Sequence, residues 1–309
     1  MTRITISVLA FAMLACLGAA PAEAQLARTF VSSVSGNDAN DCNRLTPCRT
    51  FQRAHDQTFD QGEITVLDPG GYGAVTITKS IAIVNDGVGE AGMLVSGGFV
   101  GITINAPNAY VHLRGLTIQG IGGGNSGIVF NNGYSLAISN CVIRSIAITG
   151  MIFSPAGDAR LAVSDTLVAD NGSSGILISP SGTGAVRVDV ERVDARNNGF
   201  GIAVSGGSST GSISAAIADS VLSANGDGIH ADSGIGNAPT VVVTRSVIAN
   251  NRTGLLATHA RLVVGDSAVS GNTFTWFLDV QGGILQSFGD NYIVGNGDGD
   301  PALPLIPRK

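Results

Sequence analysis

The feature that most constrains this chain is a repeat of about 25 residues in its second half. A glycine followed by an apolar residue recurs at intervals of 23, 25, 26, 27 and 26 residues. The copies are Gly127-Ile128, Gly150-Met151, Gly175-Ile176, Gly201-Ile202, Gly228-Ile229 and Gly254-Leu255. A unit of this length has room for three short strands and three turns, but not for a helix beside them. The repeat therefore predicts a solenoid in which each unit forms one coil.

Each repeat contains a segment in which apolar and other residues alternate, as in a strand with one buried face. A segment beginning at Val186 fits the others after a shift of one residue. The alternation places inward Leu161, Val163, Ala215, Ile217, Val241, Val243, Leu262 and Val264. One coil cannot bury such a face alone, whereas coils stacked about 4.8 Å apart share a continuous core. We predict an all-β, single-domain parallel β-helix of about nine coils over residues 63–296.

Asparagines recur at one position of the repeat. They are Asn171, Asn197, Asn225, Asn251, Asn272 and Asn296, each six residues after a polar or acidic position. Stacked asparagines can hydrogen-bond to one another along the solenoid axis, and asparagine tolerates the left-handed backbone of a tight turn. We therefore assign these residues to a structural ladder.

The polar position six residues earlier forms a second column. Its members are Asn140, Asp165, Glu191, Asp219, Arg245, Asp266 and Asp290. Like charges at the coil spacing repel, so an entirely acidic column would need cations. Arg245 separates Asp219 from Asp266 and could pair with both. We interpret the column as turn-capping side chains bonded to local backbone amides, with calcium binding as the alternative.

Composition limits the function classes that fit the chain. Only 13% of the residues are charged and 43 are glycine, whereas an average globular domain has about 25% charged residues. This balance suits short strands joined by tight turns. The formal net charge is −6, so the chain lacks an overall basic character, and we expect no nucleic-acid partner.

The first 24 residues predict a secretory signal peptide. Arg3 supplies the positive start, the run Ile4–Ala20 is apolar, and Ala22-Glu23-Ala24 is a cleavage site, so the mature chain begins at Gln25. A membrane anchor is the alternative, although the run is short for one, and Cys16 permits a lipoprotein interpretation. We expect an exported protein, periplasmic or extracellular, with no stable membrane insertion after cleavage.

Three cysteines remain in the mature chain. Cys42 and Cys48 close a short loop, and an exported protein meets oxidising conditions, so we favour a disulfide between them. A metal site is the alternative, but no histidine lies nearer than His55. Cys141 falls within a strand pattern and is interpreted as a small buried apolar residue.

The N-terminal region carries three further motifs. They are Ser35-Gly36-Asn37-Asp38-Ala39-Asn40, then Pro47-Cys48-Arg49-Thr50-Phe51-Gln52, then the run from Gly62 to Tyr72 that reads Gly-Glu-Ile-Thr-Val-Leu-Asp-Pro-Gly-Gly-Tyr. With the repeats, nearly the whole mature chain resembles bacterial right-handed β-helix repeat proteins of the pectate-lyase-like superfamily. The resemblance implies a right-handed coil, in line with the general preference of parallel crossovers. It implies no single activity, because that superfamily includes lyases, hydrolases, epimerases and proteins without known activity.

Both ends of the coil need cover, because an open end exposes strand edges and an apolar floor. We interpret residues 25–62 as an N-terminal cap. A helix over Arg49–Phe59 is expected to direct Phe51, Ala54 and Phe59 toward the open end. The repeat decays after Trp276, and residues 297–309 are expected to form a tail.

The outward positions of the first strand column are mostly small or aliphatic. They are Ala137, Ser139, Ala162, Ser164, Arg187, Asp189, Ala216, Ala218, Val242, Thr244, Val263 and Gly265. Tyr110, His112 and Arg114 lie earlier on what we interpret as a solvated strand face. This surface is flat and does not have the charged residues typical of an active-site cleft.

The candidates for chemistry are charged residues of neighbouring coils. Pectate-lyase-like enzymes use an arginine or lysine base, with calcium neutralising the uronate carboxylate. The resemblance would give the base role to Arg245, between Asp219 and Asp266. Asp219, Asp232 and Asp266 could instead supply the carboxyl pair of a glycosidase. His230 and Arg252 are candidate binding residues if their loops fold over the trio.

One further metal site is suggested near the C-terminus. Asn296, Asp298 and Asp300 alternate like the start of a calcium loop, although Pro301 stands where such a loop needs glycine. We expect no cofactor, with calcium as the one alternative.

Two functions remain. The favoured one is a non-catalytic exported β-helix protein, at the cell surface or in the envelope, that binds a polymer such as a polysaccharide, or a partner, along its long face. The alternative is a carbohydrate-active enzyme, either a pectate-lyase-like lyase or a glycoside hydrolase. The alternative requires acidic and basic side chains to converge near Asp219, Arg245 and Asp266.

Overall fold

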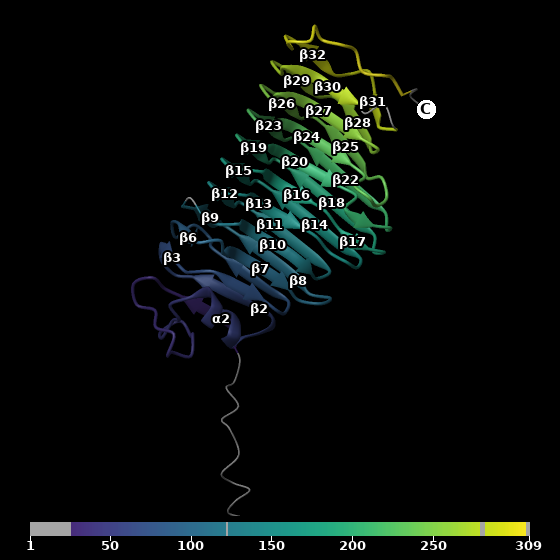
Figure 1. The fold of residues 1–309 in the computed structure, drawn as a ribbon. Coiled ribbons are helices and arrows are strands. Elements are labelled where there is room, and N and C mark those ends of the chain that lie inside the picture. The colour runs from purple at the N-terminus through teal and green to yellow at the C-terminus, as the bar shows by residue number, and fades with distance from the viewer. Residues whose placement is uncertain (1–25, 122, 279–281, 307–309) are drawn as a thin grey trace, which may run out of the picture.

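A computed structural model describes residues 26–121, 123–278 and 282–306. The predicted signal peptide and Cys16 lie outside the described residues. Within the described ranges, no helix is long and apolar enough to cross a membrane. The chain winds as a right-handed parallel β-solenoid, which confirms the predicted fold class (Figure 1).

Three parallel sheets run along the solenoid (Figure 1). Sheet A contains β1 (Leu26–Val31), β2 (Thr58–Val66), β5 (Ile81–Val84), β8 (Tyr110–Arg114), β11 (Ser135–Ser139), β14 (Ala159–Ser164), β18 (Val186–Glu191), β22 (Ile213–Ala218), β25 (Thr240–Thr244), β28 (Arg261–Gly265) and β31 (Ile284–Ser287). Sheet B contains β3 (Gly70–Gly71), β6 (Ala91–Val95), β9 (Leu116–Gly120), β12 (Val142–Arg144), β15 (Leu167–Ala169), β19 (Asp194–Arg196), β23 (Val221–Ser223), β26 (Val247–Ala249), β29 (Ala268–Ser270) and β32 (Tyr292–Val294). Sheet C contains β4 (Val75–Ile77), β7 (Val100–Asn105), β10 (Ser126–Asn132), β13 (Thr149–Phe153), β16 (Ser174–Ile178), β20 (Phe200–Ser205), β24 (Asp227–Asp232), β27 (Thr253–Thr258) and β30 (Phe274–Leu278). A two-stranded sheet of β17 (Ser181–Gly182) and β21 (Ser208–Ser209) lies in the loops between sheets C and A.

The core consists of the alternating residues that point into the coil. All eight residues predicted to face inward are buried, and each stacks on the equivalent residue of the next coil, as Leu161 does on Val188. Phe130 and Phe153 stack with ring centroids 4.5 Å apart. Burial of this apolar surface is the main stabilising contribution, at about 25 cal/mol per Å² removed from water.

The asparagine ladder is present, with one correction. Asn198, not Asn197, stands between Asn171 and Asn225. Its side-chain amide donates to Asn225 Oδ1 at 3.0 Å, and its own Oδ1 accepts from the Asn171 side chain at 2.9 Å. Asn197 is exposed and donates to Asp170 instead, at 2.6 Å. The sequence prediction was wrong at this coil because the coil has one extra residue before the ladder position.

The same extra residue shifts the charged column. The left-handed turn position is occupied by Asn140, Asp165, Arg192, Asp219, Arg245 and Asp266, with φ between 47° and 53°. Arg192 therefore replaces the predicted Glu191. It forms an ion pair with Asp165 at 2.7 Å, so two arginines alternate with acidic residues along this corner. Alternation of sign removes most of the repulsion that an acidic column would have.

The N-terminal region both extends and caps the solenoid. Strand β1 pairs with β2, and Cys42 is joined to Cys48 by the predicted disulfide. Helix α2 (Phe51–Gln57) begins after Thr50, whose side chain accepts from the backbone amide of Arg53. Figure 1 shows α2 at the end of the solenoid opposite the C-terminus.

Two details of the predicted cap helix change. Phe51 and Ala54 are fully buried, as predicted, but Phe59 is 55% exposed. The helix ends at Gln57, and Thr58 begins strand β2 while its hydroxyl donates to Ala54 O at 2.6 Å. Phe59 thus belongs to a strand, and its predicted core-facing position was wrong. Cys141 is a buried free thiol, as predicted.

The cap also contains a buried histidine whose protonation opposes folding. His55 Nε2 accepts a hydrogen bond from the backbone amide of Thr78 at 3.2 Å, which requires that nitrogen to be unprotonated. Burial lowers the pKa of His55, and Lys79 lowers it further, while Asp56 raises it. The unfolded chain, with a histidine pKa near about 6.5, therefore binds the proton more readily than the folded chain.

From this, we expect the stability that His55 contributes to be complete above about pH 6.5 and to be lost as pH falls toward the folded-state pKa. A His55→Gln variant, whose amide oxygen can still accept from Thr78, should lose less stability between pH 7.5 and pH 5.5. Urea unfolding of both proteins at the two pH values measures the difference. Identical losses in both proteins would contradict a role for this histidine.

Candidate functional site

The predicted catalytic trio lies at the corner between sheets A and B. Arg245 donates two hydrogen bonds to Asp219, at 2.9 and 2.7 Å. This pairing raises the pKa of Arg245 and lowers that of Asp219. Asp266 adds a weaker attraction to Arg245, and its backbone amide donates to Asp290 at 3.0 Å. A base needs a pKa close to the working pH, so this arrangement does not favour proton abstraction by Arg245, and a catalytic role stays a prediction.

His230 and Arg252 meet at a different corner, on the far side of strand β23. Both contact Asp227, the first residue of β24: Arg252 at 2.8 Å and His230 Nδ1 at 3.3 Å. Asp227 is buried, with 2% of its side chain exposed. The two predicted binding residues therefore come together as a pair, but around Asp227 and not over Arg245.

The predicted calcium ligands are engaged in hydrogen bonds at the C-terminal end. Asp300 accepts from the backbone and side-chain amides of Asn296 and from the backbone amide of Gly295, which lowers the pKa of Asp300. Asp298 accepts from the backbone and hydroxyl of Thr275. Asn296 is the last rung of the asparagine ladder. These bonds close the last coil, and a calcium role for the three residues stays a prediction.

The outward face of sheet A is mostly flat, as predicted. Ala162, Asp189 and Ala216 are exposed in consecutive strands and face solvent. Two of the predicted outward positions differ, because Val263 is only 3% exposed and Gly265 lies under the Phe288 ring. Phe288 belongs to the C-terminal segment, which covers this end of the sheet.

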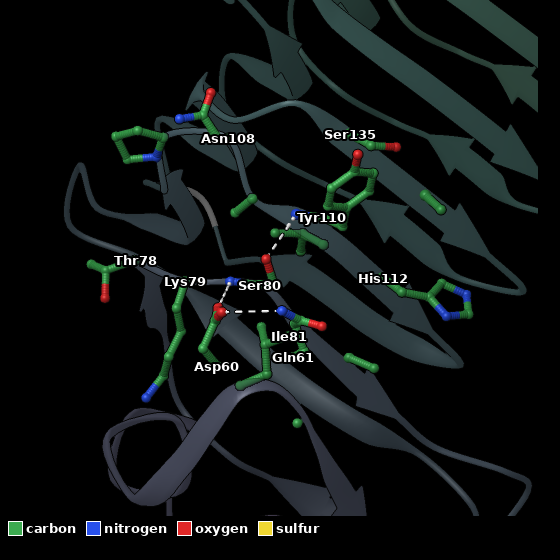
Figure 2. Close-up of a pocket in the computed structure, with 16 residues that line it drawn as sticks. Asp60, Gln61, Thr78, Lys79, Ser80, Ile81, Asn108, Tyr110, His112 and Ser135 are labelled. Carbon is green, nitrogen blue, oxygen red and sulfur yellow. Dashed lines mark hydrogen bonds between the residues drawn. The ribbon is translucent and has the colours of Figure 1, made fainter.

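A groove of about 800 Å³ hollows this face near the N-terminal end (Figure 2). Its floor includes Ala82 and Ala137, and its rim is formed by Asp60 and Gln61 of β2 and by the loops at Thr78–Ser80 and Pro107–Ala109. Tyr110 projects into it with 61% of its surface exposed. Asp60 is fixed by the backbone amide of Ser80 at 2.9 Å.

The side-chain nitrogens of Lys79 and His112 in the groove lie close to oxygen atoms of the protein. Lys79 turns its ammonium away from Tyr110 and donates to Thr58 O at 2.5 Å. Its partial burial lowers the pKa of Lys79, while Asp56 and Asp60 raise it. His112 Nε2 lies 3.4 Å from the Ser139 hydroxyl. The groove therefore presents hydroxyl, imidazole and aromatic groups beside a small apolar floor.

Beyond the groove, two arginines continue the line of Tyr110 along the sheet. Register places Tyr110, Ser135, Arg160 and Arg187 opposite one another in four consecutive strands. We call these four residues the anion row. Arg160 lies over the Tyr134 ring, with its Cζ atom 5.9 Å from the centroid, and the Tyr110 and Tyr134 rings are 5.2 Å apart.

Neither arginine of the anion row forms an ion pair within the described ranges, and both are exposed. Most other exposed arginines here have a partner, as Arg28 has Glu63 and Arg114 has Asp86. From the sequence, Arg187 was placed on this face, whereas Arg160 and the pairing of Tyr134 with Tyr110 were not predicted. The position of Arg160 could have been predicted from the repeat, because Arg160 lies one repeat after Ser135.

Comparison with known proteins supports the architecture. The chain matches the family described as the right-handed beta helix region over residues 126–297, more than half of its length. It is similar to the solved structure of pectate lyase Pel9A, with a TM-score of 0.68 and 16% identity over 84% of this chain and 74% of that one. It is also similar to an alginate lyase from Paenibacillus sp., with a TM-score of 0.50 and 13% identity over 91% and 98% of the two chains. No curated protein sequence gives a significant match. At these identities the solved structures show a shared fold alone, while the family match is decisive: the chain belongs to the right-handed β-helix family.

Proposed function

We propose that this protein is exported and binds an acidic polysaccharide along the outward face of sheet A, without cleaving it. The observation that carries the proposal is the anion row, in which two arginines without ion-pair partners in the described structure follow Tyr110 and lie beside Tyr134. The predicted signal peptide and the Cys42–Cys48 disulfide support export, because disulfides persist in oxidising compartments.

Electrostatics selects the charge of the ligand. Arg160 and Arg187 are direct neighbours in adjacent strands, where backbones lie about 4.8 Å apart. Two like charges at this separation repel, and a bound anion reverses the sign of the interaction. Guanidinium groups bind carboxylates through two parallel hydrogen bonds. A polymer that carries a carboxylate on each sugar can place one against each arginine.

The tyrosines select the shape of the ligand. Tyr110 and Tyr134 present a mostly apolar ring with a polar tip, which suits the apolar face and hydroxyl edge of a sugar ring. Their side-by-side arrangement continues directly into Arg160. The groove before them gives the bound chain a recess of about 800 Å³. Together these features favour a linear uronate polymer lying along the solenoid axis.

The geometry gives less support to cleavage. Arg245, the predicted base, is paired with Asp219 at a separate corner. Lys79 is directed toward the cap and away from Tyr110.

The alternative function, a polysaccharide lyase or glycoside hydrolase, makes a distinct prediction. Incubation with polygalacturonate or alginate, with and without calcium, would then release unsaturated uronates or reducing ends. Either signal, if abolished by Arg245→Ala, would replace the non-catalytic proposal.

Removing both arginine charges should weaken polymer binding. We expect an Arg160→Gln/Arg187→Gln variant to bind hexagalacturonate or hexa-alginate at least about tenfold more weakly, since each charged hydrogen bond contributes roughly 1.5–3 kcal/mol. Binding by the natural protein should also weaken as salt is added, because exposed charges are screened. Isothermal titration calorimetry measures both effects.

The matched control is Arg144→Gln on sheet B. Arg144 is also exposed, but it donates to Gln119 at 3.0 Å and lies on another face. Its loss should leave the affinity unchanged. Equal weakening by Arg144→Gln and by the double variant would show that overall charge, and not the anion row, governs binding.

A further inference from the structure

One coil carries a set of charged residues on sheet C that its neighbours do not have. The titratable side chains of β24 are the buried Asp227 and the partly exposed His230 and Asp232. The next coil has Thr253, Leu256 and Thr258 at these positions, the preceding coil has Phe200, Ala203 and Ser205, and the coil before that has Ser174 and Leu177 at the first two. The fold therefore accommodates hydroxyl and aliphatic side chains here, so packing alone does not require Asp227, His230 and Asp232.

Burying the Asp227 carboxylate costs free energy. Transfer of a carboxylate out of water is unfavourable, and a buried ion pair often contributes little net stability. Burial opposes ionisation of Asp227, but hydrogen bonds from His230 and Thr253 and the charge of Arg252 outweigh it and lower its pKa. A threonine at this position, as in the next coil, would need none of these partners.

The contact with Asp227 fixes the orientation of the His230 imidazole. A carboxylate can only accept, so His230 carries a proton on Nδ1, which lies 3.3 Å from Asp227 Oδ2. The other ring nitrogen, Nε2, faces Asp232 Oδ2 at 3.6 Å. Asp232 Oδ1 is held by the backbone amide of Gly234 at 2.6 Å and by the Ser205 hydroxyl at 3.1 Å. When Nε2 carries no proton, Nε2 and Asp232 Oδ2 are two acceptors that share no donor, so a ligand hydroxyl can donate between them.

Arg252 provides a hydrogen-bond donor next to His230 and Asp232, and Phe200 provides an aromatic surface. Arg252 uses one guanidinium nitrogen on Asp227 and leaves 64% of its side chain exposed, so its other donors remain available to a ligand. The Phe200 ring stands perpendicular to His230, with centroids 4.9 Å apart. A sugar matches these groups. Its hydroxyls can donate to the two acceptors, a hydroxyl oxygen can accept from Arg252, and the apolar face of its ring can pack on Phe200.

We propose that Asp232, His230, Arg252 and Phe200 form a binding subsite for a neutral sugar residue, on a different face from the anion row. A sugar hydroxyl donates to His230 Nε2 and Asp232, a neighbouring hydroxyl oxygen accepts from Arg252, and the ring packs on Phe200. Asp227 positions His230 and Arg252 without touching the sugar. The two carboxylates repel an acidic sugar, which separates this ligand class from the uronate polymer proposed for sheet A.

The repeat itself supplies the test variant. Asp227→Thr/His230→Leu/Asp232→Thr restores at each position the residue of the next coil, so the variant should fold with an equal or higher melting temperature. The probes are mannohexaose, cellohexaose and galactohexaose. Calorimetry measures the affinity of the full mature chain for each of them. We expect at least one of them to bind the natural protein, and the variant to bind it at least about tenfold more weakly. Hexagalacturonate binding should be unchanged in the variant, which keeps the two proposals separable.

Asp189→Ala is the matched control, because alanine occupies the neighbouring positions 162 and 216 of sheet A. It should leave neutral-sugar binding intact. If the triple variant does not fold, Asp232→Ser, which restores the residue of the preceding coil, carries the same expectation for binding. The proposal is overturned if none of the three hexaoses binds the natural protein. It is equally overturned if the restored variant binds them as well as the natural protein, since the cluster would then be an internal ion-pair network alone.

Discussion

Replacing Asn198 with alanine should lower the free energy of unfolding by about 4 kcal/mol. The Asn198 side chain makes four hydrogen bonds in a buried position: to Val168 O, to Asn225 Oδ1, and from the backbone and side-chain nitrogens of Asn171, at 2.9–3.1 Å. Truncation leaves these partners without a bond and without access to water, and each unsatisfied buried group costs about 1–3 kcal/mol. Urea unfolding followed by circular dichroism measures the loss.

Asn197→Gly is the control for this prediction. Asn197 is the adjacent residue, and its φ of 54° is accessible to glycine without strain. Its single side-chain bond goes to Asp170 at the surface, so we expect a loss below about 1 kcal/mol. Comparable losses for the two variants would mean that the ladder does not pass through Asn198.

Gly201→Ala should be the second most damaging substitution, with a loss of about 2–3 kcal/mol. A β-carbon at this position would lie 2.6 Å from the carbonyl oxygen of Gly228 and 3.0 Å from the Asn225 side chain. Neither neighbour can retreat easily, because the first is backbone of the next coil and the second is a ladder rung. The recurring glycine thus provides space for the asparagine ladder, which explains why the two features repeat together.

Gly157→Ala provides the comparison for this substitution. Position 157 is a surface site at which an added β-carbon meets nothing within 4 Å. Alanine there should be neutral or slightly stabilising, because it restricts the unfolded chain. Thermal unfolding of both variants measures the difference. A similar melting temperature for Gly201→Ala and Gly157→Ala would contradict the proposed close approach between coils.

The sequence was sufficient for the fold because the relevant signals are periodic and local. The glycine spacing, the strand alternation and the short cysteine loop each follow from interactions that repeat in every coil or lie within a few residues. One error in aligning the repeats led to both wrong predictions, Asn197 in the asparagine ladder and Glu191 in the charged column. Glu191 was matched to Asp165 because both are acidic, whereas Arg192 occupies the turn, and Asn198 lies six residues after Arg192.

The candidate sites were harder to predict because they depend on register between coils. Arg160 and Arg187 become neighbours only when strands 27 residues apart in sequence are paired residue by residue. Asp227 was overlooked because its burial and its two partners are properties of the folded corner, not of a motif. His230 and Arg252 were identified individually, but the structure assigns them to Asp227 and not to Arg245.

The central claim is that an acidic polysaccharide lies on sheet A across the anion row. The most direct test is a crystal structure of the mature protein with hexagalacturonate at saturating concentration. We expect sugar rings against Tyr110 and Tyr134, with successive carboxylates on Arg160 and Arg187. A bound chain on sheet B or sheet C, with the anion row empty, would contradict it.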